Sequence, residues 1–430
     1  LKAMRAGADF QRADLACIIY TSGTGGTPRG VMLSHGSILS NCEGAAQIVR
    51  DDFSPSEDVF LSFLPLSHAY EHTGGQFLPI QLGAQIYYAE SLEKLATNIE
   101  EVRPTIMVVV PRLFEMLRAR ILRAVNDQGP MAQALMTSAL DLGIRKQEGR
   151  AHFWHKPRDL LLNATIRRKV RARFGGRIKA LISGGAPLNP EVGLFFESLG
   201  LTLLQGYGQS EAGPIIACNR PRAGIKMDTV GPPLAGAEVK IADDGEILVR
   251  GELVMQGYWR RPEDTAAAIV DGWLHTGDVG HLDERGRLKI TDRKKDLIVN
   301  DKGENISPQK VEGMLTLAPE IHQAMVVGDK HPYLVGLIVP DPEWAAHWAC
   351  HEDIKFDMDA LIALPQFHSA VMAAVDGVNR ELAVNERVRR IALVADPFSV
   401  TNGMLTPSIK IRRHQIKAEY GDRLDGLYRA

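Results

Sequence analysis

The sequence predicts an α/β protein in which a large first domain is followed by a smaller α+β domain. Short apolar runs alternate with helical stretches, and Thr105–Val110 is continuously apolar, as in a parallel strand covered on both faces. Two further apolar runs lead directly into glycine-rich turns, where ligands bind in α/β sheets. A charged run at residues 292–296 lies between apolar segments and indicates a linker between the domains.

The composition is that of an ordinary globular protein, with 430 residues, 45% of them hydrophobic and 24% charged. The net charge of -2 provides no overall attraction to nucleic acid. The four cysteines have no metal-binding or redox spacing, which favours a reduced, cytoplasmic setting. No apolar run is long enough to cross a bilayer.

The first glycine-rich stretch, residues 20–30, lies between two apolar runs that we expect to be strands, 16–19 and 31–33. It contains four glycines and four Ser or Thr residues, whose amide hydrogens and hydroxyls suit phosphate oxygens. An ordinary glycine-rich hairpin is the alternative. The stretch lacks the Gly-Lys-Ser/Thr ending of a Walker A motif.

After this stretch we expect a helix capped by Ser34 and running through residues 38–48. Strands should follow at 58–64, 83–89 and 104–110. The segment from His68 to His72 matches the inverted zinc-protease motif, so a zinc site built on His68, Glu71 and His72 is an alternative. A match of five residues arises easily by chance.

Residues 118–179 are strongly basic, with fifteen Lys or Arg residues against four acidic ones. A charge run of this kind is usually the solvated face of helices. The alternative is a cationic surface for anionic lipid or for the phosphates of a ligand, and Phe153 and Trp154 within the run are typical interfacial anchors.

Glycine turns return at residues 179–188 and 203–211, each after an apolar strand. Glu211 supplies a carboxylate, the hard oxygen ligand that suits magnesium. Residues 243–246 should form a hairpin turn between strands, and the motif at 272–278 ends on Asp278, whose carboxylate accepts two hydroxyl donors well.

The second domain should begin near residues 303–308. An amphipathic helix is expected at 309–317, and paired strands at 323–327 and 334–339. Near the end Gly403 should make a turn, and Lys410 begins a basic stretch.

The chain resembles the adenylate-forming superfamily. Residues 20–30 resemble its phosphate-binding loop, with Gly25 in place of a hydroxyl residue and Arg29 in place of the usual Lys. Motifs of the superfamily occur in order at residues 20–30, 183–188, 206–211, 272–278, 292–308 and 402–410. The extended helical segment after Val110 most resembles long-chain acyl-CoA synthetases.

This resemblance implies a large multi-sheet α/β adenylate-forming domain over residues 1–292, followed by a hinge linker over 293–296. A small mobile α+β C-terminal domain, residues 297–430, would carry the catalytic lysine. In relatives further strands and helices precede the phosphate loop, so we expect that the N-terminal portion of the large domain is missing from this chain.

The resemblance also implies site residues. Lys410, Glu211 and His68 would be catalytic, with His68 lining the acyl and adenylate pocket. Glu211 and Ser210 would bind Mg²⁺, while Lys295 would act as the hinge and Gly303 would lie on the path of coenzyme A. ATP and AMP would be bound by Thr21, Ser22, Gly23, Thr24, Gly26, Thr27, Arg29, Gly184, Gly185, Ala186, Gly206, Tyr207, Gly208, Ser210, Asp278 and Arg293. Within this set Tyr207 would stack on adenine, and Asp278 and Arg293 would contact the ribose.

The implied function is an ATP-dependent acid–thiol ligase. It would convert a fatty acid, expected to be long-chain, to acyl-CoA through acyl-AMP, using ATP, Mg²⁺ and coenzyme A. Alternatives are a synthetase for another carboxylic acid, an enzyme that stops at acyl-AMP, the zinc hydrolase above and a non-enzymatic binding module. We expect a cytoplasmic protein that associates peripherally with the inner face of a membrane and binds no nucleic acid.

Overall fold

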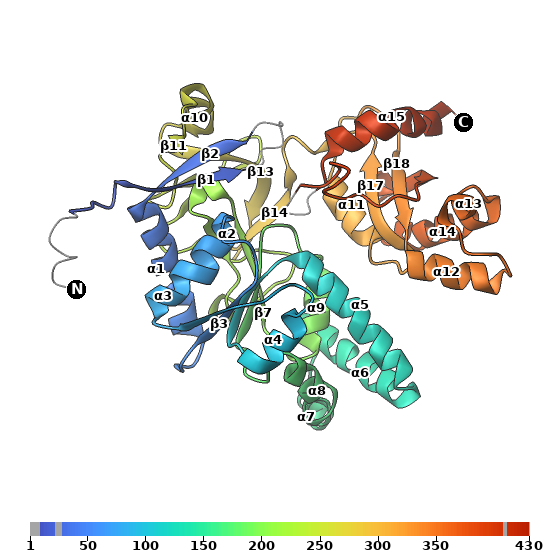
Figure 1. Cartoon of the computed structure of the whole chain (residues 1–430), viewed down its shortest axis with the longest axis horizontal. Helices are drawn as coiled ribbons and strands as arrows, with labels where there is room; N and C mark the ends of the chain where they lie inside the picture. The colour runs from blue at the N-terminus through green and yellow to red at the C-terminus, as the bar shows by residue number, and fades with distance from the viewer. Residues whose placement is uncertain (1–8, 22–27, 407–410, 430) are drawn as a thin grey trace. The chain divides into compact units, whose positions relative to one another are not determined.

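The computed structural model describes residues 9–21, 28–406 and 411–429. The chain divides into two compact units, which we call unit 1 (Leu1–Ile290) and unit 2 (Thr291–Ala430), coloured from blue to yellow and from orange to red in Figure 1. Each unit is described by itself.

In its described residues, unit 1 is built on a six-stranded sheet of order β4-β3-β5-β6-β7-β8. The first five of these strands are parallel and β8 is antiparallel to β7. All four residues of β3 and of β5 are buried, which confirms the continuous apolar run as a covered parallel strand. The bounds are β3 (Val59–Ser62), β4 (Gln85–Tyr88), β5 (Ile106–Val109), β6 (Ala180–Ser183), β7 (Leu203–Gly208) and β8 (Ile215–Cys218).

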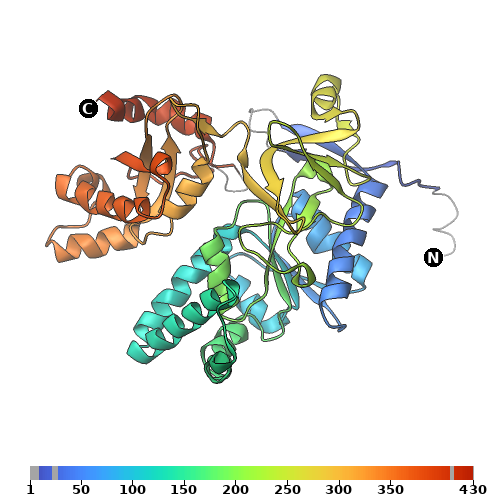
Figure 2. The ribbon, with the colours of Figure 1, turned by 180° about the vertical axis from the view of Figure 1, so that it is seen from behind.

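Helices cover both faces of this sheet, as Figures 1 and 2 show, with α1 and α3 on one side and α5 and α9 on the other. The expected cap is confirmed, because the Ser34 hydroxyl accepts a hydrogen bond from Ser37 N at the start of α1. The bounds are α1 (His35–Asp52), α2 (Ala69–Glu71), α3 (Leu78–Leu82), α4 (Leu95–Val102) and α9 (Pro190–Ser198), with a π-helix, η1 (His72–Phe77), between α2 and α3.

The strands that flank the first glycine-rich stretch form an antiparallel hairpin. β1 (Leu15–Thr21) pairs with β2 (Arg29–Ser34), and β11 (Gly257–Tyr258) pairs with the other edge of β2. The register ends at Thr21 opposite Arg29, so the two ends of the stretch are held side by side. Residues 22–27 between them lie outside the described residues.

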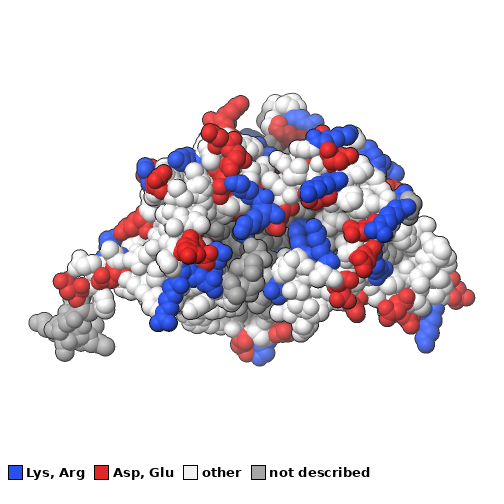
Figure 3. Space-filling view, turned by 90° about the horizontal axis from the view of Figure 1, so that it is seen from above, with Lys and Arg blue, Asp and Glu red and all other residues white. Residues whose placement is uncertain are grey.

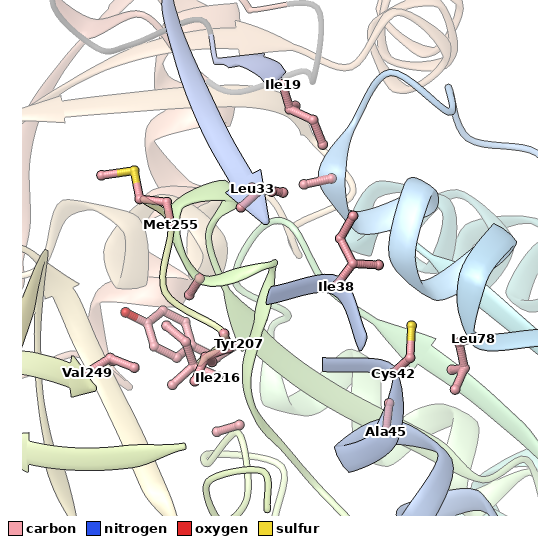
Figure 4. Packing of buried hydrophobic residues seen from close by; sticks show 14 of the residues in the cluster. Ile19, Leu33, Ile38, Cys42, Ala45, Leu78, Tyr207, Ile216, Val249 and Met255 are labelled. Carbon is pink, nitrogen blue, oxygen red and sulfur yellow. The ribbon is translucent and has the colours of Figure 1, made fainter. Parts of the chain in front are cut away.

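A further antiparallel sheet joins β12 (Ile269–Val270), β13 (Trp273–Leu282), β10 (Glu246–Arg250) and β9 (Glu238–Ile241) in that order, with β14 (Leu288–Arg293) on β13. The hairpin turn expected at residues 243–246 joins β9 to β10. One hydrophobic cluster unites these sheets with α1. Figure 4 shows Val249 of β10 beside Tyr207 of β7 and Ile216 of β8, with Ile38 and Cys42 of α1 nearby.

The basic segment folds as helices inserted between β5 and β6. They are α5 (Pro111–Asp127), α6 (Pro130–Gln147), η2 (Phe153–His155), α7 (Lys156–Ala164) and α8 (Ile166–Arg173). The helical segment predicted after Val110 is therefore present. The acidic residues of this segment either form ion pairs with its basic residues or are exposed. Asp141 and Asp159 each form ion pairs with two basic residues of the segment.

Unit 2 is centred on the sheet β17 (Ile321–Val327), β18 (Leu334–Pro340) and β19 (Val388–Leu393). The predicted pairing of residues 323–327 with 334–339 is confirmed as the antiparallel β17–β18 pair, while β19 runs parallel to β18. Alternate strand residues face two separate clusters, as expected from the two-residue period of strands. One cluster includes Ile338 and Phe367, and the other includes Leu337 and Ile416.

Helices cover both faces of the unit 2 sheet. α11, α12, α13 and α14 contribute to the first cluster and α15 to the second. Their bounds are α11 (Pro308–Leu315), α12 (Pro342–His351), α13 (Met358–Ile362), α14 (Pro365–Asn379) and α15 (Arg413–Arg429), and a short pair, β15 (Ile298–Val299) and β16 (Asn305–Ile306), precedes them. The structure thus has the predicted fold class, an α/β unit of several sheets followed by a smaller α+β unit.

Candidate active site

Arg29, at the end of the first glycine-rich stretch, is fixed by side chains from elsewhere in unit 1. Its guanidinium lies 3.5 Å from the Asp264 carboxylate and 5.2 Å from the centre of the Tyr258 ring. On the opposite strand the Thr21 hydroxyl approaches Arg29 O at 3.4 Å. The hairpin therefore places a positively charged side chain, Arg29, in a fixed position at the end of the glycine-rich stretch. The other residues implied here, Ser22, Gly23, Thr24, Gly26 and Thr27, lie outside the described residues.

Tyr258 connects Arg29 to Glu211. Its hydroxyl donates a hydrogen bond to Glu211 Oε1 at 2.8 Å, while its ring lies under the Arg29 guanidinium. Burial, reinforced by the charge of Glu211, raises the pKa of Tyr258, so its hydroxyl stays a donor. The sequence around Tyr258 does not predict this role, because it is the pairing of β11 with β2 that brings Tyr258 next to Arg29.

Glu211 and Ser210 lie at the start of the short helix η3 (Ser210–Ala212), directly after β7. The Glu211 side chain is half-buried, and Tyr258 hydrogen-bonds one carboxylate oxygen and so orients the other. Within the described ranges no group of three or more His, Cys, Asp or Glu side chains forms a metal cage. A single oriented carboxylate fits Mg²⁺, which takes few protein ligands when phosphates supply the others.

The two glycine motifs at the carboxyl ends of β6 and β7 lie side by side. β6 and β7 are neighbouring parallel strands with Ser183 opposite Gln205, so Gly184, Gly185 and Ala186 follow one strand end while Gly206 and Gly208 lie in the other. Gly184 is needed because the Tyr70 ring packs against it, and a Cβ at this position would lie 2.7 Å from Tyr70 Cζ. These strand ends form the sheet edge where ligands bind in α/β folds.

Tyr207 and Asp278 meet at this edge. The Tyr207 hydroxyl donates to Asp278 Oδ2 at 2.7 Å, and Asp278 is only 4% exposed. Figure 4 shows the Tyr207 ring among Ile216 and Val249, which hold it in the core cluster. Tyr207 and Asp278, which belong to separate motifs and are both expected to bind the nucleotide, are therefore in direct contact.

His68 is the exposed residue that precedes α2. The neighbouring Glu71 turns inward, where the Ser62 hydroxyl at the end of β3 donates to its Oε1 at 2.5 Å. Burial raises the pKa of Glu71 to about 7, partly opposed by the hydrogen bond from Ser62. The His72 ring instead packs edge-on against Phe77, and burial lowers its pKa. Glu71 and His72 thus have partners of different kinds, and the three residues of the zinc alternative form no metal-holding group in the described part of the chain.

Unit 2 carries the remaining implied residues. Arg293 ends β14, and Lys295 is exposed in the turn that follows, whose hydrogen bonds run from Asp296 N and Leu297 N to Arg293 O. Gly303, with φ +78°, lies in the turn between β15 and β16. Lys410 lies outside the described residues.

The chain just after Lys410 is anchored by a buried ion pair that sequence reasoning missed. Arg413 Nη2 lies 2.5 Å from Glu312 Oε2, and Glu312 Oε1 accepts from Val326 N at 2.8 Å. Because Glu312 is on α11 and Arg413 begins α15, the pair joins these helices to β17. No local pattern marks Glu312, which is one acidic residue of an amphipathic helix.

Comparison with known families gives two matches. Residues 3–259 match the AMP-binding enzyme family, and residues 295–430 match the C-terminal domain of AMP-binding enzymes. Similar curated proteins include long chain acyl-CoA synthetase 7, peroxisomal, of Arabidopsis thaliana, which is 35% identical over 96% of this chain. The long-chain-fatty-acid–CoA ligase FadD15 of Mycobacterium tuberculosis is 32% identical over 98% of this chain and 70% of its own length.

Solved structures show the same fold. The adenylation domain of carboxylic acid reductase from Segniliparus rugosus, in complex with AMP and a co-purified carboxylic acid, has a TM-score of 0.71 at 25% identity, over 97% of this chain and 62% of that one. The o-succinylbenzoate-CoA synthetase of Bacillus subtilis, at 22% identity, has a TM-score of 0.66 over 97% of this chain and 73% of that one. The chain spans 61% of the length of the two Arabidopsis relatives.

Proposed function

The chain belongs to the AMP-binding enzyme family, and we propose that it activates a fatty acid with ATP and transfers the acyl group to coenzyme A. In the first half-reaction the carboxylate attacks the α-phosphorus of ATP, giving acyl-AMP and pyrophosphate. In the second, the thiol of coenzyme A attacks the acyl carbonyl and AMP leaves. Neither step needs a protein nucleophile, so the four cysteines have no catalytic role in this scheme.

One observation carries the proposal. The Tyr258 side chain contacts both Arg29, at the end of the phosphate-loop stretch, and Glu211, the candidate magnesium ligand. Arg29 and Glu211 are far apart in sequence, and each separately suits one part of a metal–triphosphate group. A cation for phosphate oxygens and a carboxylate for Mg²⁺ are what transfer at phosphorus requires, since such catalysis is mainly positioning and charge stabilisation.

The family resemblance implies the remaining roles. Asp278, oriented by Tyr207, would accept hydrogen bonds from the ribose hydroxyls, and the glycine motifs at the ends of β6 and β7 would contact the adenine. His68 would line the acyl side, and Arg293 would add a ribose contact. Bound Mg²⁺ would neutralise phosphate charge during adenylation, with Glu211 and Ser210 holding it.

In unit 2 we propose that Lys410 supplies positive charge at the α-phosphate during adenylation. Rotation about the turn at Lys295 would then withdraw it and bring the Gly303 turn toward the path of coenzyme A. Such hinges are a few residues at the ends of elements that absorb a large backbone change. The exposure of Lys295 in a turn directly after β14 supports this assignment.

Long-chain fatty acids are the proposed substrates because the similar proteins from Arabidopsis and Mycobacterium are named for them. The test is ATP–pyrophosphate exchange over a panel of short, long and aromatic acids, with and without coenzyme A, followed by identification of the acyl product. Exchange that is fastest with long-chain acids, and acyl-CoA as product, is expected. Exchange without any thioester would identify an enzyme that stops at acyl-AMP, and exchange only with other acids would replace the substrate.

We also propose that the basic segment associates with the surface of an anionic membrane. Around η2 the side chains of Phe153 and Trp154 are 74% and 60% exposed, and Leu160 and Leu161 on α7 are also exposed. Exposed aromatic and aliphatic side chains among cations are typical of interfacial contact. Elsewhere, on the face that Figure 3 shows, basic and acidic side chains are intermingled. Among the described residues no helix is both long and apolar enough to cross a bilayer.

A further inference from the structure

The β10–β13 pair contains a bulge at the motif that carries Asp278. Leu248 lies opposite His275, but Glu246 lies opposite Val279, so the single residue Ile247 faces Thr276, Gly277 and Asp278. Two extra residues on β13 are therefore accommodated there. Bulges beside active sites commonly redirect a side chain that a regular strand would place elsewhere.

Glu246 is the side chain that spans this bulge. It is 6% exposed, its Oε1 accepts a hydrogen bond from Gly277 N at 2.9 Å, and its Oε2 lies 3.3 Å from His275 Nδ1. Both contacts cross from β10 to β13, to residues one and three positions before Asp278. A buried carboxylate is costly unless polar groups satisfy it, so this one is tied to the bulge conformation.

The backbone of the bulge has its own supports. Gly277 has φ +70°, a left-handed conformation that favours glycine. The Thr276 hydroxyl donates to Ile247 O at 2.7 Å and accepts from Asp278 N at 3.1 Å. Glycine alone makes this turn accessible but does not select it, because glycine is equally free in other conformations. The hydrogen bond from Gly277 N to Glu246 acts with the two Thr276 contacts to select this conformation.

We propose that Glu246 is a positioning residue for nucleotide recognition, which fixes the β13 bulge and thereby directs the Asp278 carboxylate to the ribose hydroxyls. The inference rests on the proposed function, since it assumes that Asp278 binds ribose. Glu246 itself contacts the Gly277 backbone and His275. Removing the Glu246 side chain should therefore keep the Asp278 carboxylate but orient it poorly toward the ribose hydroxyls.

The test compares the affinity of the protein for ATP and for 2′,3′-dideoxy-ATP, which lacks both ribose hydroxyls. Hydrogen bonds to a charged group should make wild-type protein prefer ATP by roughly 10- to 100-fold. Asp278→Ala should abolish most of this preference. Glu246→Ala should lower it to within about threefold of the Asp278→Ala value, because the charge–hydroxyl bonds lose their alignment.

Glu246→Gln is the conservative variant, since its amide oxygen still accepts from Gly277 N. Its preference for ATP should stay within about threefold of wild type. The matched control is Glu238→Ala on the adjacent strand β9, whose exposed carboxylate pairs with Arg250, and it should retain the wild-type preference. Thermal melting of each variant checks the fold. If Glu246→Ala does not fold, Glu246→Asp replaces it, because the shorter side chain keeps the charge but does not reach Gly277 N.

The outcomes separate the inference from its premise. If Asp278→Ala loses the preference while folded Glu246→Ala keeps it, Glu246 has no positioning role and the ribose assignment stands. A folded Glu246→Gln variant that discriminates as poorly as Glu246→Ala would overturn the role of the Gly277 hydrogen bond. If wild type and Asp278→Ala show the same preference, Asp278 does not bind ribose, and the inference falls together with that part of the proposed function.

Discussion

Replacing the buried carboxyl of Glu71 by an amide should change how the stability of unit 1 depends on pH. Glu71 is 1% exposed, and its Oε2 has no hydrogen-bond partner among the described residues. Burial is the main reason that its pKa is raised from 4.5 to about 7, and no charged group contributes to the shift. Glu71→Gln keeps the size of the side chain and an acceptor for the Ser62 hydroxyl, but removes the titration.

The sign follows from proton linkage. Because the folded pKa is above the unfolded one, folded protein binds more protons between pH 4.5 and 7, and its stability falls as the pH rises through this window. At about 1.4 kcal/mol per pKa unit, the shift predicts a loss of roughly 2 to 3 kcal/mol of unfolding free energy between pH 5 and pH 8. In Glu71→Gln this loss should be absent.

The measurement is urea unfolding of wild type and Glu71→Gln at pH 5 and pH 8, followed by a probe in unit 1. The amide adds a buried N–H₂ group whose cost is independent of pH. The informative quantity is therefore the change, from pH 5 to pH 8, in the difference in unfolding free energy between wild type and Glu71→Gln. Glu57→Gln, which alters an exposed carboxylate, is the control. Equal pH dependence in wild type and Glu71→Gln would show that the carboxyl does not titrate in this range.

Further predictions concern the proposed chemistry. Lys410→Ala should slow adenylation by about 100-fold or more, through loss of charge at the α-phosphate, and should slow thioester formation from pre-made acyl-AMP much less; equal losses in both assays would contradict the assignment. Glu211→Gln should raise the Mg²⁺ concentration for half-maximal adenylation by about tenfold with an unchanged melting temperature, and an unchanged magnesium titration would place the metal elsewhere. Lys295→Pro fixes φ within the turn, so adenylation should persist and thioester formation should fall steeply; normal rates in both would move the hinge. Binding to phosphatidylserine vesicles should weaken as the salt concentration rises from roughly 0.05 M to roughly 0.5 M, and it should be weaker still in Phe153→Ser. Binding that is insensitive to salt and to anionic lipid would exclude the electrostatic account.

The parallel sheet was predictable because its strands are short and continuously apolar. Thr105–Val110 contains the fully buried β5, and the paired strands of unit 2 were found from the same signal. Strand ends were less accurate: the strand expected at 58–64 ends at Ser62, where the side chain turns to meet Glu71. The π-helix after α2 was also missed, since side-chain spacing does not distinguish a π-turn from an α-turn over six residues.

Motif residues of the site were recognisable from sequence, but the residues that hold them were not. Asp278 ends a recognisable motif, whereas Glu246 appeared only as the last residue of a hairpin turn. Tyr258 and Arg413 likewise act through partners more than forty residues away, Glu211 and Glu312. Such contacts depend on which strands pair and on the register between them, and one sequence carries no local record of either.

The connection between β5 and β6 has a practical consequence. These neighbouring strands keep a continuous register from Ile106–Ala180 to Val109–Ser183, although residues 110–179 lie between them. At Gly149, past the end of α6, the backbone is exposed and has open space around it. Closing a longer loop costs little, about 0.6 kcal/mol for each doubling of its length. Gly149 is therefore a suitable position for inserting a fluorescent reporter domain without disturbing strand order.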